Sequence, residues 1–242
     1  MTTRRIRVGA FFSALLLLAM LALAAGCHRA ASRAATPADQ TAPAPAAKAP
    51  PAPCSCPEAN PAPGRPAIYP CQIKNCPGLH NLGQVTDRLY RGAQPKSSGY
   101  KQLQDLGIRL VVNFRNQPDK IDEEEKAVRT HGMRYVSLPW SARRRPSNAQ
   151  VAQFLQLVRD NPDTKIFVHC QAGADRTGTM VALFHIARQC AKPEDTRAEM
   201  HAFHYHHFFF PHLEKYVKDF PQRLRDDSQL RALQSPACLA AR

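Results

Sequence analysis

A cysteine and an arginine separated by five residues, Cys170 and Arg176, are the residues of this chain best suited to covalent chemistry. The segment between them is rich in small residues. It lies between an apolar, β-branched stretch that predicts a buried strand (165–169) and a stretch that predicts a helix (179–188). Such a strand–loop–helix unit turns free backbone N–H groups and the positive end of the helix dipole toward one point. The sequence therefore predicts a phosphate cradle at residues 170–176.

Each residue type in this loop has an expected part in phosphoryl transfer. The cradle and Arg176 favour the ionised thiolate of Cys170, which is the nucleophilic form. Arg176 has a planar fork that can bind two phosphoryl oxygens, and the hydroxyl of Thr177 could reach the sulfur and stabilise it as a leaving group. Cys170 would attack phosphorus, and water would then hydrolyse the thiophosphate, with positioning and charge stabilisation carrying most of the rate. The predicted phosphate-binding residues are Gln171, Ala172, Gly173, Ala174, Asp175 and Arg176.

The same segment resembles the signature of the cysteine-dependent phosphatase superfamily, in its small dual-specificity branch. That signature is His-Cys, five residues, Arg, and then Ser or Thr. These positions are held here by His169, Cys170, Arg176 and Thr177. A second stretch, 87–115, resembles the amino-terminal part of bacterial members, so the resemblance covers about residues 80–222. It implies a tyrosine or dual-specificity protein phosphatase that needs no metal or other cofactor.

The general acid that this resemblance implies is missing. Family members carry an Asp on the loop after the third strand, and the matching segment here, 138–147, has neither Asp nor Glu. Three alternatives remain: Asp175 inside the phosphate loop, Asp119 from another loop, or no side-chain acid and a preference for substrates with good leaving groups. Asp175 is our preferred candidate, because myotubularin-type lipid phosphatases also carry an Asp before the motif Arg. Its structural alternative is to hydrogen-bond loop N–H groups or to orient a neighbouring side chain.

Three consecutive arginines, 143–145, lie on the same loop. A basic run is ordinarily a solvated surface, but beside a phosphate pocket it would favour a polyanionic ligand. A phosphoinositide phosphatase therefore stays open as an alternative to a protein phosphatase. A phosphate-binding protein without turnover is the other alternative. Trp140 could form a wall of the pocket or pack in the core.

The amino terminus indicates export. A basic start is followed by an apolar run (8–25) and Cys27, which predicts a signal peptide at 1–26. The small residues before Cys27 resemble a bacterial lipoprotein cleavage box, so we expect a lipid anchor on Cys27 and a periplasmic domain held at the outer membrane. An uncleaved membrane anchor is the alternative. The Ala/Pro-rich segment 27–67 predicts an extended tether.

The other cysteines and the charge fit this compartment. The chain has 8 cysteines and a net charge of +14. An oxidising periplasm favours disulfides over a zinc site, for which no four-ligand spacing is present. We expect a local bond between Cys71 and Cys76 and a bond between Cys190 and Cys238. The charge favours anionic partners, but no nucleic-acid motif is found, so nucleic acid is not an expected partner. The cysteines available for disulfides are Cys54, Cys56, Cys71, Cys76, Cys190 and Cys238.

Alternating strand and helix patterns predict one α/β domain (68–225) with a central, largely parallel sheet flanked by helices. A segment rich in histidine and phenylalanine, 201–211, is expected to pack helices together, with metal binding and contact with a membrane surface as the alternatives. The polar tail 226–242 is expected to fray. Predicted helices cover 97–106, 121–130, 147–158 and 179–188, with two more that begin at Pro193 and Pro211, and predicted strands cover 109–114, 133–138 and 165–169.

Overall fold

A mixed sheet forms the centre of the domain. The computed structural model describes Cys54 and residues 71–240, and in these residues the strand order is β1-β2-β3-β6-β4-β5. The neighbours β3, β6, β4 and β5 are parallel, whereas β1 and β2 are added antiparallel beside β3. The single α/β domain with a largely parallel sheet is therefore confirmed. The strands are β1 (Cys71–Ile73), β2 (Leu82–Gln84), β3 (Leu89–Ala93), β4 (Leu110–Asn113), β5 (Arg134–Ser137) and β6 (Ile166–Cys170).

The two central strands are buried along their whole length. β4 has the sequence LVVN and β6 the sequence IFVHC, and every residue of both strands is buried. Continuous apolar, β-branched strands are typical of a parallel sheet that is covered on both faces. The register pairs Asn113 of β4 and Ala93 of β3 with His169 and Cys170 of β6, respectively. The carboxyl ends of three strands therefore meet at one edge, where α/β proteins bind ligands.

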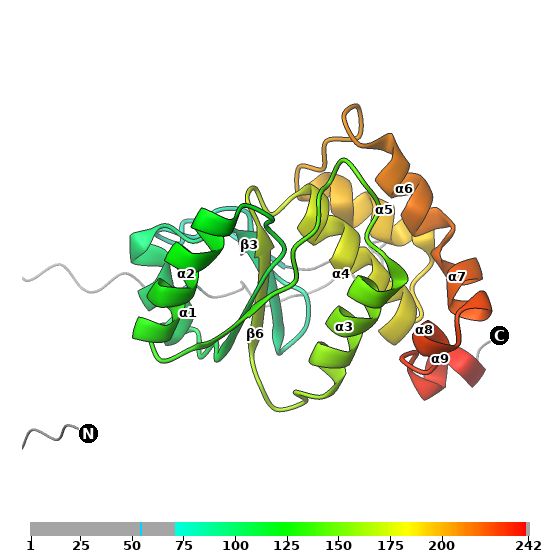
Figure 1. Cartoon of the computed structure of the whole chain (residues 1–242), viewed down its shortest axis with the longest axis horizontal. Helices are drawn as coiled ribbons and strands as arrows, with labels where there is room; N and C mark the ends of the chain where they lie inside the picture. The colour runs from blue at the N-terminus through cyan, green and yellow to red at the C-terminus, as the bar shows by residue number, and fades with distance from the viewer. Residues whose placement is uncertain (1–53, 55–70, 241–242) are drawn as a thin grey trace, which may run out of the picture. The chain divides into compact units, whose positions relative to one another are not determined.

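Helices cover both faces of the sheet (Figure 1). α1 (Ser97–Asp105) and α2 (Pro118–Thr130) lie on one face, where Leu103 and Val128 pack against Phe167 of β6 in one apolar cluster. The other helices form the opposite layer. They are α3 (Asn148–Arg159), α4 (Asp175–Arg188), α5 (Pro193–Ala202), α6 (Pro211–Lys218), α7 (Phe220–Asp226), α8 (Ser228–Arg231) and α9 (Pro236–Ala240).

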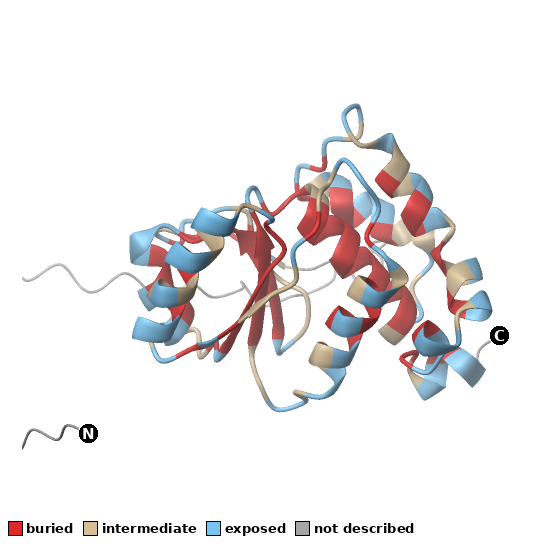
Figure 2. Ribbon diagram, viewed as in Figure 1, coloured by how far each residue is buried: buried red, intermediate tan, exposed pale blue. Residues whose placement is uncertain are grey.

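The helix that follows β6, α4, is the centre of the second layer. It contacts α3, α5, α6 and α7, and nearly all of its residues are buried (Figure 2). A helix that is covered on all sides carries apolar or small residues on every face, as the segment TGTMVALFHIA does. α4 begins at Asp175, four residues before the predicted start, so Arg176 and Thr177 lie in its first turn.

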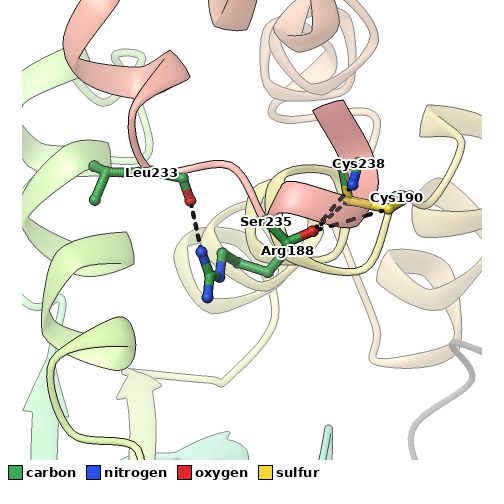
Figure 3. The surroundings of a disulfide bond; sticks show 5 residues. All are labelled: Arg188, Cys190, Leu233, Ser235 and Cys238. Atoms are coloured by element: carbon green, nitrogen blue, oxygen red, sulfur yellow. Dashed lines mark hydrogen bonds between the residues drawn. A yellow bond between two sulfur atoms is a disulfide. The ribbon is translucent and has the colours of Figure 1, made fainter. Parts of the chain in front are cut away.

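The carboxyl-terminal segment is part of the core, and the prediction that it frays is wrong for the described residues. Leu230 and Leu233 are buried in the larger apolar cluster. The predicted disulfide between Cys190 and Cys238 is present and ties α9 to the end of α4 (Figure 3). Arg188 also donates a hydrogen bond to the carbonyl of Leu233, 3.0 Å away. The burial of a few apolar side chains is sufficient to order this segment, although its average composition is polar.

The amino-terminal disulfide differs from the prediction. Cys76 is bonded to Cys54, not to Cys71, which is itself disulfide-bonded. Cys54 lies within the predicted tether, so this disulfide links that point of the tether to the domain. Residues 1–53 and 55–70 lie outside the described residues, and with them the predicted signal peptide (1–26), Cys27 and most of the tether (27–67). None of the helices in the described part of the chain is long and apolar enough to cross a membrane.

Other helix ends also differ from their predicted positions. α3 begins at Asn148, after Ser147, whose hydroxyl accepts from the N–H of Gln150 while the Gln150 side chain accepts from the Ser147 N–H. These two hydrogen bonds form a capping box at the start of the helix. The helix that begins at Pro211 ends at Lys218, and α7 starts directly after Asp219.

Candidate active site

The backbone of the phosphate loop is held from outside through its carbonyl groups. The carbonyl of Gln171 accepts from the N–H of Gln94 at 3.2 Å, and that of Ala172 accepts from Nδ2 of Asn81 at 3.1 Å. The carbonyl of Gly173 accepts from Nη2 of Arg91 at 3.0 Å. Within the described residues, the N–H groups of 171–174 have no protein acceptor. The loop therefore keeps its N–H donors for an anion, as a phosphate-binding loop requires.

Gly173 is required by the fold of this loop. Its φ is +70°, and a Cβ atom there would lie 2.3 Å from the carbonyl carbon of Gly92 and 2.5 Å from the nitrogen of Ala93. Only glycine combines this left-handed conformation with so close an approach to another backbone. The close packing of the loop against β3 therefore depends on glycine at this position.

A buried ion pair supports the loop from behind. Arg91 of β3 and Glu199 of α5 are both almost fully buried, and their side chains meet at 2.6 Å. The other carboxylate oxygen of Glu199 lies 2.7 Å from Nε2 of His185, and the ring of Phe203 lies 3.9 Å from the Arg91 guanidinium carbon. Burial lowers the pKa of Arg91, and the charge of Glu199 opposes that shift. These residues were not predicted from the sequence, although a buried arginine inside a strand is a signal of such a role.

Cys170 is the last residue of β6 and the free cysteine of the described chain. Its exposed fraction is 3%. It lines a pocket of about 570 Å³ together with Arg176 and Asp175. The structure therefore brings together the predicted nucleophile, the predicted phosphate-binding arginine and the candidate acid. The other residues that line this pocket are Ala142, Arg143, Gln171, Ala172, His206, Phe209 and Phe210.

Three oxygen atoms fix the guanidinium of Arg176. Its Nη1 lies 3.3 Å from the carbonyl of Phe114, 3.1 Å from Oδ1 of Asn116 and 3.4 Å from the carbonyl of Trp140. No other atom of this guanidinium has an acceptor among the described residues, which leaves the rest of its donors for a ligand. Asn116 was not predicted. Trp140 is buried in the core, so the core-packing alternative for this residue is the one observed.

Thr177 is fully buried in the first turn of α4. Its Oγ1 makes no hydrogen bond with any described residue, Cys170 included. The predicted contact between this hydroxyl and the cysteine sulfur is therefore not formed in the structure. Oγ1 is a buried polar atom without a protein partner, next to Arg176.

Asp175 lines the pocket, and its carboxylate binds His206 of the loop between α5 and α6. Oδ1 accepts from the backbone N–H of His206 at 2.9 Å, and Nδ1 of the imidazole lies 3.1 Å from both carboxylate oxygens. His206 was not singled out from the sequence, because its partner is 31 residues away. Asp119, the other candidate acid, is an exposed residue of the first turn of α2 and is not among the pocket residues.

The rim of the pocket comes from two segments. Arg143 is exposed and lines the pocket, whereas Arg144 and Arg145, also exposed, do not line it. The other segment is residues 203–210, which we call the aromatic loop. Its first part packs as predicted, since Phe203 and Tyr205 are buried, but Phe208 and Phe209 are 85% and 76% exposed. Within the described residues, no group of three or more potential metal ligands is found, in this loop or elsewhere.

A second buried pair lies behind the cysteine. Nε2 of His169 is 3.2 Å from Oε1 of Glu124, and both side chains are fully buried. Burial raises the pKa of Glu124 to about 7 and lowers the pKa of His169 to about 3. Asn113 donates to Glu124 at 2.7 Å, and the N–H of Arg115 donates to the side chain of Asn113. At neutral pH, an uncharged imidazole therefore lies behind the phosphate loop.

Comparisons with known proteins agree with this geometry. A family model described as "DSP-PTPase phosphatase fused to NAD+ Kinase" matches residues 79–211. The dual specificity protein phosphatase TpbA of Pseudomonas aeruginosa (strain UCBPP-PA14) is 30% identical over 109 residues, which are 45% of this chain and 48% of that protein. The chain thus spans about half the length of this curated relative.

Solved structures share the fold. A crystal structure of P. aeruginosa TpbA superimposes with a TM-score of 0.54 at 24% identity and covers 72% of this chain and 96% of that chain. A cysteine-to-serine variant of TpbA in complex with pTyr also has a TM-score of 0.54 at 24% identity, and the match covers 64% of this chain and 91% of that chain.

Proposed function

The chain belongs to the family of DSP-PTPase phosphatases described as fused to NAD+ kinase, and from this membership and the geometry of its loop we propose that it hydrolyses phosphate monoesters through a phosphocysteine. One observation carries the proposal. Cys170 and Arg176 line one pocket, the loop N–H groups have no acceptor among the described residues, and every loop carbonyl from 171 to 174 has a donor elsewhere. This arrangement offers donors to an anion and a thiol to its phosphorus.

In the first step, Cys170 attacks the phosphorus atom of the ester. The loop N–H groups and the free donors of Arg176 bind the three non-bridging oxygens, and they stabilise the charge that develops on them. The contacts of Arg176 with Phe114, Asn116 and Trp140 hold the guanidinium in place before the substrate arrives. Preorganisation of this kind keeps the cost of reorganising the site low.

In the second step, water attacks the phosphocysteine, and the thiolate leaves. The Nδ1–H of the uncharged His169 donates to the carbonyl of Cys170, 3.1 Å away, and so fixes the end of β6. The buried pair of Arg91 and Glu199 fixes the opposite side of the loop through Gly173. Both supports are internal to the fold and need no ligand to form.

We propose phosphotyrosine or dual-specificity protein substrates. The name of TpbA and its complex with pTyr support this substrate class. The test is inorganic phosphate release by the mature chain from phosphotyrosine and phosphoserine peptides, with the Cys170→Ser protein as the blank. Release from phosphotyrosine that disappears in the variant is the expected result. Vanadate or phosphate binding without any Cys170-dependent release would instead identify a binding protein without turnover.

Phosphoinositides are the second candidate substrates, and the rim favours them. Arg143 lines the pocket, and Phe208 and Phe209 are exposed beside it. Cationic and aromatic side chains together suit an anionic lipid headgroup at a membrane surface. Phosphate release from phosphoinositides in vesicles that exceeds release from phosphotyrosine peptides would favour this class over protein substrates.

We also propose that the protein is exported and anchored by lipid on Cys27, on the periplasmic side of the outer membrane. The signal-like residues 1–26 support this location. The disulfides Cys54–Cys76 and Cys190–Cys238 support an oxidising compartment. Labelled palmitate should enter the wild-type chain and not the Cys27→Ala variant. A mature chain that retains residues 1–26 would contradict the proposal and favour an uncleaved anchor.

A further inference from the structure

The pocket holds one carboxylate among the described residues that line it, and a histidine already occupies that carboxylate. Asp175 accepts the backbone N–H of His206 at 2.9 Å, and the Nδ1 atom of His206 lies 3.1 Å from both of its oxygens. The loop that would carry an acid in other members, 138–147, has no Asp or Glu. Both carboxylate oxygens of Asp175 thus lie against His206, which leaves this group poorly placed to deliver a proton itself.

His206 has the geometry of a proton donor. Because Nδ1 is bound to the carboxylate, Nε2 is the atom left for the substrate, and it has no partner among the described residues. The side chain is 47% exposed and lines the same pocket as Cys170. The ring of Phe209 packs against the imidazole with the centroids 6.3 Å apart. A carboxylate that binds one imidazole nitrogen orients the ring and stabilises the imidazolium.

We propose that His206 is the proton donor to the leaving group and that Asp175 is its positioning residue, a role that rests on the phosphatase function proposed above. His206, on the aromatic loop between α5 and α6, thereby supplies the proton that other members obtain from the loop that corresponds to 138–147 of this chain. Histidine is the side chain that most often performs general acid–base catalysis. Arg143, the other charged side chain at the rim, does not give up its proton in proteins.

Nε2 of His206 gives up a proton in the first step and takes one back in the second. As the bond between Sγ of Cys170 and phosphorus forms, the bond between phosphorus and the ester oxygen breaks, and that oxygen takes the proton of Nε2 to leave as an alcohol or phenol. In the second step, the neutral Nε2 accepts a proton from water as the water oxygen bonds to phosphorus. The bond to sulfur breaks, the thiolate leaves with its electron pair, and His206 is again protonated.

Substrates with different leaving groups provide the test. Wild type, His206→Gln and the matched control His207→Gln, whose side chain belongs to the same loop but does not line the pocket, are compared on a series of aryl and alkyl phosphates. For poor leaving groups such as alkyl alcohols or tyrosine, we expect His206→Gln to lose about 10²–10⁴-fold in kcat/KM, the usual contribution of a general acid. For strongly acidic phenols, which leave without a proton, the loss should be less than about tenfold. His207→Gln should follow wild type across the series.

A second pair of variants keeps the proposal open to refutation if His206→Gln folds poorly. Asp175→Asn keeps the size of the side chain and should show the same dependence on the leaving group, with a smaller loss, while vanadate binding stays within about threefold of wild type. Added imidazole should restore turnover of poor leaving groups in His206→Ala. A loss that is uniform across the series, or no loss at all, would overturn the role of His206. Absence of Cys170-dependent turnover in wild type would overturn the phosphatase function itself.

Discussion

The phosphate loop and the rim of its pocket differ in how firmly the molecule holds them. In the loop, the carbonyls of 171–174 all have donors, and the buried pair of Arg91 and Glu199 supports Gly173 from behind. In the rim, Arg143 and Phe208 are exposed to solvent. The part that binds the phosphoryl group, which every substrate shares, is fixed in advance. The part that meets the rest of the substrate is left adaptable.

The largest effect is expected from breaking the ion pair between Arg91 and Glu199, which supports the phosphate loop. In Arg91→Met, the buried carboxylate of Glu199 loses its charge partner, and removing one member of a buried pair costs about 3–5 kcal/mol of unfolding free energy. Chemical denaturation measures this loss. The double variant Arg91→Met/Glu199→Gln should recover part of it, because no unpaired charge remains. A single variant as stable as wild type would show that the loop does not depend on this pair.

The next largest effect concerns the loop itself. Arg176→Lys keeps the charge but loses the planar fork that binds two phosphoryl oxygens, so kcat/KM should fall by about 10²–10³-fold. Stability should change little, since the loop carbonyls keep their donors. Phosphate release measured beside a thermal unfolding curve separates the two effects. Activity near that of wild type would mean that a point charge is sufficient at this position.

The contact between His169 and Glu124, behind Cys170, predicts that the stability of the protein depends on pH. Burial raises the pKa of Glu124 from 4.5 to about 7, so the folded protein holds this proton more tightly than the unfolded chain does. The contribution is fully present below about pH 4.5 and is lost as the pH rises through about 7. The unfolding free energy of wild type relative to Glu124→Gln should therefore fall by about 3 kcal/mol across that window.

Urea denaturation of both proteins at several pH values checks this prediction. The expected result is two profiles that run parallel below about pH 4.5, where Glu124 is uncharged in folded and unfolded chains alike, and whose difference changes above it. Parallel profiles over the whole range would mean that the pKa of Glu124 is the same in the folded and the unfolded protein.

The smallest effect is expected in the rim. Phe208 is 85% exposed and does not line the pocket, so Phe208→Ser should change the unfolding free energy by no more than about 0.5 kcal/mol. Turnover of small aryl phosphates should also stay close to that of wild type. A weaker turnover of vesicle-bound phosphoinositides alone would assign this residue to a lipid surface. A large loss of stability would contradict the contrast between loop and rim.

The same contrast explains how much could be predicted from the sequence. Cys170 and Arg176 were identified because the nucleophile, the arginine and the strand and helix that hold them are contiguous. His206 and Glu199 were missed because their partners, Asp175 and Arg91, are 31 and 108 residues away in the sequence. The carboxyl-terminal tail was mispredicted for the same reason, since the burial of Leu230 depends on helices far away in the sequence. The disulfide of Cys76 was also mispredicted, because its partner is Cys54, 22 residues away, and not the nearer Cys71.

The measurement that tests the central claim most directly is detection of the covalent intermediate. The protein is mixed with an aryl phosphate, quenched in acid within the first turnover, digested and examined by mass spectrometry. The account predicts a phosphoryl group on the peptide that contains Cys170, which accumulates faster than it is hydrolysed in His206→Gln for good leaving groups. Turnover without any adduct on Cys170, or turnover that persists in Cys170→Ser, would contradict it.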